Sequence, residues 1–240
     1  MDRGMRRFWD RRAEEDAFFF VDTRLDYGDP DLDWFWHEGD RILDETLAQL
    51  GVAVGPGDEV VDVGCGVGRF TRALAARARH VRGLDVSPRM LELAREHNAH
   101  LGNVEWIQGD GTTLAPLPDA SADACFSYVV FQHIPDPAVT YGYVREMGRV
   151  LRPGGWAAFQ VSDDPGVHRP RTAAERARSA LAGLARRGPR GWTRPEYRGS
   201  AVDLDELRSA AASAGLEIER IDGAGTQYCL VLARRHPARG

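Results

Sequence analysis

The sequence contains no lysine, few cysteines and no long apolar run, and each shortage excludes a class of protein. All 31 basic side chains are arginine, and 36 acidic side chains leave a net charge of −5. This balance disfavours a nucleic-acid partner, because such binding depends on neutralising phosphates. The three cysteines, Cys65, Cys125 and Cys229, are too few and too scattered for a disulfide framework or a zinc site. We therefore expect no metal centre.

Apolar segments are short along the whole chain. None approaches the ~18–20 residues that a membrane-spanning helix needs. Acidic residues precede any apolar run at the N-terminus, which argues against a signal peptide. The composition therefore predicts a soluble, cytoplasmic protein that does not associate with a membrane. Its 240 residues suit one domain, or one domain with a lid.

The charges are segregated along the chain. Residues 165–200 hold nine arginines and two glutamates, whereas residues 22–45 hold nine acidic side chains and two arginines. One interpretation is that both segments are solvated surface. The other is that the acidic front and the basic insertion close on each other over a substrate, or that the arginines bind an anionic group on it. High-GC codon usage is the simplest reason for the missing lysines, so the use of arginine does not decide between them.

Short apolar strands alternate with helical stretches from residue 58 onward. Strands are predicted at 59–63, 81–86, 104–108, 124–131 and 156–162, with helices around 70–79, 88–94 and 137–151. This alternation predicts an α/β fold, a mostly parallel, doubly wound sheet with helices on both faces. Two further strands at 216–221 and 227–233 are close enough in sequence to pair as a hairpin.

Two segments fall outside this alternation. Residues 1–51 are helical and rich in aromatic side chains, and we expect them to form an N-terminal lid or cap. Residues 163–200 are rich in Arg, Ala, Gly and Pro, with one helical stretch near 172–186, and are predicted to be an inserted substrate cap. Residues 52–162 and 201–240 would then form the ligand-binding core.

A glycine-rich turn follows the strand at 59–63. It reads Asp62-Val63-Gly64-Cys65-Gly66-Val67-Gly68-Arg69 and opens a helix. Glycines at such a turn let the backbone bend sharply and let a ligand lie against the peptide groups. Asp85 ends the next strand, 21 residues after Gly64 (85 − 64 = 21), which is the placement of a carboxylate that bridges two ribose hydroxyls. Together these features predict an adenosine-containing ligand.

The glycine spacing distinguishes between cofactors. A dinucleotide fingerprint has its third glycine where this chain has Arg69, so an NAD-dependent oxidoreductase is the less favoured alternative. The pattern Asp-x-Gly-x-Gly-x-Gly instead resembles motif I of the class I S-adenosylmethionine-dependent methyltransferases. The resemblance continues through 84–87, 109–111, 123–128, 130–134 and 146–155, and in outline over 203–234. It implies a seven-stranded Rossmann-like sheet with a reversed last strand, S-adenosylmethionine as cofactor and S-adenosylhomocysteine as its product.

The resemblance also assigns roles around the glycine turn. It implies that the backbones of Gly64, Cys65 and Gly66 approach the methionine and ribose portions of the cofactor. It implies that Asp62 orients the turn and reaches the ammonium group through water, and that Asp85 accepts both ribose hydroxyls.

Five further residues follow from the same resemblance. Val86 would lie against the adenine, Asp110 would accept from its amino group, and the Gly111 N–H would meet a ring nitrogen. Ser127 and Tyr128, at the end of the fourth strand, would contact the methionine portion.

A histidine follows the fourth strand, where an acceptor should arrive. His133 suits a general base, because its unperturbed pKa is about 6.5. The alternative is a histidine that only pins the turn at 134–137, and His168 is a second candidate base. Methyl transfer itself asks little of a side chain, since the sulfonium is already activated.

The predicted activity is transfer of a methyl group from S-adenosylmethionine to an O, N or C nucleophile of a small-molecule acceptor, with an anionic acceptor left open. The main alternative is a non-catalytic scaffold that binds the same cofactor. Residues 127–130 read Ser-Tyr-Val-Val and lack an Asn-Pro-Pro-Tyr-type motif, which disfavours methylation of a base amine. The sequence predicts neither the acceptor nor the oligomeric state.

Overall fold

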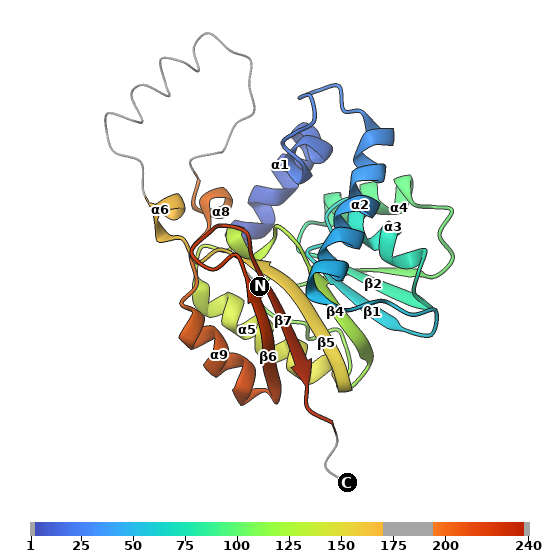
Figure 1. Cartoon of the computed structure of the whole chain (residues 1–240). Helices are drawn as coiled ribbons and strands as arrows, with labels where there is room; N and C mark the ends of the chain where they lie inside the picture. Colours follow the sequence, from blue (N-terminus) through green and yellow to red (C-terminus); the bar gives the residue numbers. More distant parts are fainter. Residues whose placement is uncertain (1–2, 170–193, 238–240) are drawn as a thin grey trace.

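A single seven-stranded sheet organises the protein. The computed structural model describes residues 3–169 and 194–237, and the strand order is β3-β2-β1-β4-β5-β7-β6 (Figure 1). The strands are β1 (Glu59–Val63), β2 (His80–Asp85), β3 (Val104–Gln108), β4 (Ala122–Ser127), β5 (Leu151–Val161), β6 (Leu216–Asp222) and β7 (Cys229–Arg235). Strands β1 to β5 pair in parallel, whereas β7 runs antiparallel to both of its neighbours. The predicted fold, with its reversed last strand, is confirmed.

The helices begin and end at the signals that the sequence carries. They are α1 (Arg3–Val21), α2 (Leu32–Leu50), α3 (Arg69–Ala75), α4 (Pro88–His97), the 3-10 helix η1 (Phe131–His133), α5 (Pro137–Val150), α6 (Pro165–His168), α8 (Pro195–Arg198) and α9 (Leu204–Ser213). The Asp31 side chain accepts the Trp34 N–H at the start of α2, and Gly51 ends that helix with φ +73°. Ser87 caps α4 in the same way.

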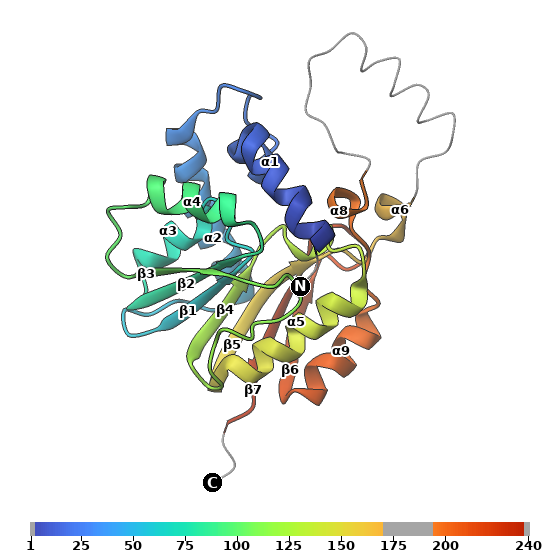
Figure 2. The same cartoon turned by 180° about the vertical axis from the view of Figure 1, so that it is seen from behind.

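Helices cover both faces of the sheet. Helices α5 and α9 pack together on one face, in front of the sheet in Figure 2. Helices α2 and α3 cover the other face, where Leu43, Leu47 and Leu50 of α2 join the buried residues of β1, β4 and β5. The second half of the predicted lid is therefore a layer on the sheet. No helix in the described ranges is long and apolar enough to cross a membrane.

Helix α1 lies elsewhere, across the end of the sheet where the parallel strands finish (Figure 2). Asp16 interrupts it with an extended backbone (φ −169°, ψ 87°), so it consists of two helical halves. The Asp16 carboxylate accepts the N–H groups of Phe19 and Gly28, at 3.1 and 2.6 Å, and so caps the second half. The helix predicted at 172–186 lies outside the described residues.

Candidate functional site

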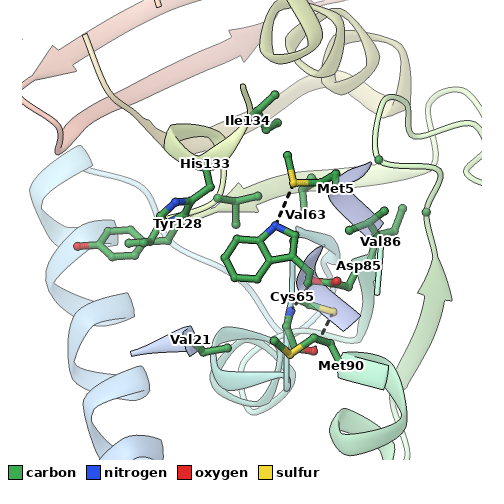
Figure 3. A pocket seen from close by; sticks show the side chains of 18 of the residues that line it. Met5, Val21, Val63, Cys65, Asp85, Val86, Met90, Tyr128, His133 and Ile134 are labelled. Atoms are coloured by element: carbon green, nitrogen blue, oxygen red, sulfur yellow. Dashed lines mark hydrogen bonds between the residues drawn. The ribbon is translucent and has the colours of Figure 1, made fainter. Parts of the chain in front are cut away.

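A cavity opens at the carboxyl ends of β1, β2 and β4, under α1. Its empty volume is about 1050 Å³ including the open mouth, and small-molecule sites span roughly 300–1000 Å³. The chain order reverses here, because β1 pairs with β2 on one side and with β4 on the other. Ligands of open α/β sheets bind at such a switch point. The glycine turn, Asp85, Tyr128 and His133 all line this cavity (Figure 3).

The glycine turn forms the floor of the cavity. The N–H groups of Gly64 and Cys65 both donate to the Leu84 carbonyl, at 2.7 and 2.9 Å, which fastens the turn to β2. Gly64 has φ +77°, and a Cβ there would lie 2.5 Å from the methyl groups of Val130. Only glycine satisfies both constraints, so the backbone at this point faces the cavity without a side chain.

Asp85 supplies the carboxylate of the cavity. Its two oxygens accept the Gly66 N–H at 2.9 Å and the Ser87 N–H at 2.8 Å. Burial raises the pKa of Asp85 to about 6, although both hydrogen bonds oppose the shift. A carboxylate has about four acceptor positions, so each oxygen keeps one for a hydroxyl donor of a ligand.

Helix α1 forms the wall opposite Asp85. The Trp9 indole N–H donates to the Met5 sulfur at 3.0 Å, and both side chains line the cavity (Figure 3). The Trp9 ring lies edge-on to the His133 ring, with centroids 5.6 Å apart. Asp10 on the same helix accepts the Ser87 hydroxyl at 2.6 Å, which ties α1 to the start of α4.

A chain of hydrogen bonds fixes His133. The Gln160 amide donates to the Gln132 side-chain oxygen at 3.0 Å, and the Gln132 amide lies 3.3 Å from His133 Nε2. His133 Nδ1 meets the Tyr197 carbonyl of α8, so Nδ1 carries the proton and Nε2 the lone pair. Burial lowers the pKa of His133 to about 4. The ring is neutral near pH 7 and is bonded to Tyr197 of α8 and to Gln132; its roles as a base and as a residue that pins the turn at 134–137 both stay predictions.

The loop after β4 holds an unusual backbone. Val129 lines the cavity with φ +58°, which is rare for a β-branched residue. Its N–H donates to the Gln160 side-chain oxygen at 2.9 Å, and Gln160 is fully buried. The sequence does not point to Gln160, since a single polar residue in an apolar strand gives no local sign of its partners.

Three predicted cofactor residues do not line the cavity. The Asp62 carboxylate is buried and accepts the Thr71 hydroxyl at 2.6 Å. The Asp110 carboxylate closes its own turn by accepting from Thr112 and Thr113. The buried Ser127 hydroxyl donates to the Val63 carbonyl at 2.9 Å. These side chains take part in internal hydrogen bonds, and their contacts with a cofactor stay predictions.

The other predicted cofactor residues do line the cavity: Gly64, Cys65, Gly66, Asp85, Val86, Gly111 and Tyr128. Their contact with a cofactor stays a prediction. His168 lies apart from the lining and joins two segments, through the Arg198 carbonyl and the Ser162 hydroxyl. Met5 and Trp9 line the cavity too, and the sequence gives only a general sign of this, because the aromatic density of the first 20 residues indicates a cap.

Known proteins resemble this chain through the same region. Residues 61–159 match a family model described as a methyltransferase domain. A malonyl-[acyl-carrier protein] O-methyltransferase of Serratia marcescens is 40% identical over 126 residues, which are 50% of this chain and 44% of that protein. A demethylmenaquinone methyltransferase of Tropheryma whipplei is 38% identical over 106 residues, 44% of this chain and 41% of that protein. The matched segments thus span less than half of either relative.

A solved structure extends the likeness to the fold of nearly the whole chain. It is a chain in the complex of the Haloferax volcanii Trm112 methyltransferase activator with a methyltransferase, with a TM-score of 0.63 and 21% identity. The match covers 95% of this chain and 97% of that one. The domain match, the sheet order and the glycine turn with Asp85 agree, and we conclude that residues 61–159 belong to the methyltransferase domain family, with the fold expected of the class I S-adenosylmethionine-dependent methyltransferases.

Proposed function

We propose that this protein transfers a methyl group from S-adenosylmethionine to a small-molecule acceptor. The observation that carries the proposal is the Asp85 carboxylate, held by the Gly66 and Ser87 N–H groups at the edge of a cavity within the methyltransferase domain. The relatives named above methylate small or carrier-bound acceptors according to their names. These names support the reaction class and leave the acceptor of this chain to experiment.

The residues present fit an adenosine-containing cofactor. The remaining acceptor positions of Asp85 suit the two ribose hydroxyls, which are paired donors. Val86 and Met90 offer apolar surface beside Asp85 for a planar base. Gly64 and Gly66 line the same cavity without a side chain of their own, so a ligand chain can lie against their backbone.

The protein's own contribution to methyl transfer is positioning. The bound cofactor would supply an electrophilic methyl group on a sulfonium, which needs no activation by a side chain. Trp9 and Met5 of α1 line the cavity, where they would shield a bound cofactor from water. Neutral His133 is poorly suited to remove a proton, because its pKa is lowered to about 4 and its Nε2 lone pair already faces the Gln132 amide. In this proposal α1 is the lid, and α2 is not.

The acceptor side of the cavity favours an uncharged, apolar or aromatic acceptor over an anionic one. It is lined by Met5, Trp9, Phe20, Val21, Tyr128 and Ile134. Among the described lining residues Arg69 is the one permanent cation, and it is already paired with Asp22 at 2.5 Å. An anionic acceptor would therefore find no uncommitted charge there. The part of the Arg-rich insertion at 170–193 lies outside the described residues, and its role as a cap stays a prediction.

Calorimetric titration tests the cofactor. We expect S-adenosylhomocysteine to bind, NAD to give no signal, and Asp85→Ala to abolish the S-adenosylhomocysteine signal. Binding of NAD alone would overturn the proposal in favour of an oxidoreductase. Turnover of labelled S-adenosylmethionine with a panel of phenolic and aromatic amine acceptors then tests the reaction. Cofactor binding without turnover of any acceptor supports the scaffold alternative.

A further inference from the structure

A fully buried glutamine lies near the end of β5. Gln160 is the next-to-last residue of this strand, and its neighbours Phe159 and Val161 are buried apolar side chains. Gln160 is not among the described residues that line the cavity. Burying an amide is unfavourable unless its oxygen and its nitrogen find hydrogen-bond partners. The position therefore calls for a defined set of contacts, and these contacts lead to the cavity.

The Gln160 amide joins three segments that are far apart in the sequence. Its oxygen accepts the Val129 N–H, in the loop after β4, at 2.9 Å. Its nitrogen donates to the side-chain oxygen of Gln132 in η1 at 3.0 Å. The same nitrogen donates to the carbonyl of Gln227, in the turn before β7. Because the oxygen and the nitrogen are both used, neither an apolar side chain nor a carboxylate could make all of these contacts.

The contact with Val129 holds a strained backbone. Val129 has φ +58°, and a β-branched residue adopts this conformation only where its surroundings fix it. The next residue, Val130, lies directly over the glycine turn, since a Cβ at Gly64 would be 2.5 Å from its methyl groups. The hydrogen bond from Val129 to Gln160 therefore sets how the loop after β4 lies against the glycine turn.

The contact with Gln132 orients a ring that lines the cavity. Because the Gln132 oxygen faces Gln160, its NH2 group is turned toward His133 and lies 3.3 Å from Nε2. His133 and Tyr128 both line the cavity (Figure 3). We call the lining residues Tyr128, Val129, Val130 and His133 the acceptor wall. Gln160 thus holds this wall at two places, the Val129 backbone and, through Gln132, the His133 ring.

We propose that Gln160 is a positioning residue for methyl transfer, which holds the acceptor wall in the alignment with the glycine turn that the reaction needs. The inference rests on the proposed function, because it concerns how an acceptor is placed against the cofactor. Methyl transfer depends on the alignment of two reacting atoms, and a displacement of about 1 Å can lower the rate about a hundredfold. Asp85 is held by Gly66 and Ser87, so the affinity for the cofactor should depend little on Gln160.

Hydrogen exchange tests the contact with Val129. Gln160→Met keeps the length of the side chain and removes both hydrogen-bonding groups. We expect the exchange rate of the Val129 N–H, divided by that of the Cys125 N–H in β4, to rise at least about tenfold, because Val129 loses its partner. The Cys125 amide corrects for a change in overall stability. An unchanged ratio would overturn the assignment.

The ring nitrogens of His133 test the contact through Gln132. In the wild type we expect nitrogen NMR signals of a protonated Nδ1 and of an Nε2 that accepts a hydrogen bond. In Gln160→Met the Nε2 signal should move toward that of a nitrogen without a donor, because Gln132 is no longer held. A loss of overall stability alone would leave this signal in place. An unmoved Nε2 signal would contradict the proposal.

Kinetics connect these contacts to the reaction. With an acceptor from the panel above, Gln160→Met should lower kcat by about tenfold to a hundredfold. The KM for S-adenosylmethionine and the calorimetric affinity for S-adenosylhomocysteine should change less than about threefold. A loss of cofactor affinity as large as the loss of kcat would indicate a general distortion of the cavity and overturn the assignment. So would an unchanged kcat.

Asp163→Ala is the matched control. The Asp163 carboxylate accepts the Gly225 and Thr226 N–H groups, at 2.8 and 3.1 Å, and so fastens to β5 the same turn that Gln160 contacts. This variant loosens the turn and leaves Gln160 in place. We expect the exchange ratio, the Nε2 signal and kcat to stay within about twofold of the wild type. If they change as in Gln160→Met, Gln160 acts only through the turn and the assignment is wrong.

Thermal unfolding verifies that each variant is folded. If Gln160→Met does not fold, Gln132→Met replaces it, since it removes the link from Gln160 to His133 at a less buried position. The Nε2 signal should then move and kcat should fall, while the exchange ratio of Val129 stays as in the wild type. An unmoved Nε2 signal or an unchanged kcat in this variant would overturn the proposal.

The wild-type protein separates this inference from the proposed function. The exchange and ring-nitrogen measurements need no acceptor. Binding of S-adenosylhomocysteine together with a freely exchanging Val129 N–H would contradict the role of Gln160 and leave the proposed function standing. Failure of S-adenosylhomocysteine to bind would contradict the proposed function and this inference with it.

Discussion

Two carboxylates beside the glycine turn are held in surroundings that favour their neutral form. Burial raises the pKa of Asp62 to about 7 and that of Asp85 to about 6, against about 3.9 in an unfolded chain. Their contribution to stability is therefore fully present below pH 4 and is lost as the pH rises through 6 and 7. Hydrogen bonds from Arg41 lower the pKa of Glu38 to about 2, so its contribution is lost only below pH 4.5. For these three groups together, stability should be greatest near pH 4 to 4.5, where the two ranges meet, and should fall as the pH rises toward 7.

Asp62→Asn replaces one of these titrating carboxyl groups with a neutral amide and keeps an oxygen that accepts the Thr71 hydroxyl. We expect the free energy of unfolding at pH 8 to exceed that of the wild type by about 1 to 4 kcal/mol, since no charge is then buried. The difference should shrink toward zero at pH 4. Urea unfolding at the two pH values measures it. A variant whose stability follows the pH as the wild type does would show that Asp62 is not the titrating group.

Asp85 gives cofactor binding its own pH dependence. Ribose hydroxyls donate to the carboxylate form, so the affinity for S-adenosylhomocysteine should fall about tenfold per unit below pH 6, the pKa of this group. Asp85→Asn should lower the affinity at pH 8 by about tenfold and flatten the profile. Calorimetric titrations from pH 5 to 8 provide the comparison. A wild-type profile that is flat across pH 6 would contradict the predicted contact.

Val129 holds a backbone conformation that glycine adopts without strain. Val129→Gly should raise the free energy of unfolding by roughly 1 kcal/mol, because a left-handed conformation is unfavourable for a side chain with a Cβ. Thermal and urea unfolding measure the change, and Val130→Ala is a neighbouring control that should destabilise. Lower stability in the glycine variant would show that the Val129 side chain contributes more by packing than its backbone loses.

At the residue scale the sequence predicts those site residues whose position follows from their spacing along the chain. Asp85 follows from its distance to the glycine turn, and its place at the cavity edge agrees with that spacing. The roles of Asp62 and Ser127 at the cofactor come from the resemblance to the methyltransferase family, which says nothing of their partners within this chain. Their partners, Thr71 on α3 and the Val63 carbonyl on β1, become visible only when the elements pack.

The division of α1 at Asp16 is the main surprise among the elements. Two short helices meet there, and one carboxylate caps the second half and holds the turn at Gly28. The first half carries Met5 and Trp9 into the cavity. The angle between the two halves at Asp16 therefore sets the position of the cavity wall that these side chains form.

Asp16→Ala should lower the free energy of unfolding by about 1 to 2 kcal/mol, the usual range for loss of a cap. Asp16→Asn keeps an acceptor for Phe19 and should lose less. Both variants should also bind S-adenosylhomocysteine more weakly, because the wall above Asp85 loses its anchor. Urea unfolding and calorimetry measure the two effects. Unchanged stability of the alanine variant would indicate that Asp16 is only a passive break in the helix.

Helix ends show the limit of local patterns. The sequence predicts a helix as far as Arg79, but α3 ends at Ala75. The Asn103 side chain, at the start of β3, donates to the carbonyls of Ala75 and Ala78 and so completes this end. Asn103 lies 28 residues from Ala75 in the chain, and its contact is a tertiary one that no helical spacing reveals.

Across the whole molecule the acidic front is largely paired within its own neighbourhood. Asp22 contacts Arg24 and Arg69, and Glu38 contacts Arg24 and Arg41. Three more carboxylates of the same stretch are paired with arginines on α2 and in the turn after α3: Glu45 with Arg41, and Asp40 and Asp44 with Arg77. Five of its nine acidic groups thus have nearby partners, and this observation favours the surface interpretation over closure on the basic insertion.

We therefore expect ionic strength to affect substrate binding weakly. The Michaelis constant for an acceptor should change less than about twofold between low salt and roughly 0.5 M NaCl. The acidic groups are already paired with nearby arginines, so their attraction to the distant basic insertion, which salt would screen, contributes little to substrate binding. Steady-state kinetics at several salt concentrations measure this once an acceptor is identified. A steep rise would revive the hypothesis that the two charged segments close over the substrate.

The reversal of β7 has a practical consequence for anyone who produces this protein. Because β7 runs opposite to β5, its last residues lie beside Trp156, at the end of the sheet away from the cavity (Figure 1). The other terminal segment enters the fold at α1, where Met5 already lines the cavity. An affinity tag or surface tether joined after β7 therefore leaves the opening clear, whereas one joined ahead of α1 would crowd it.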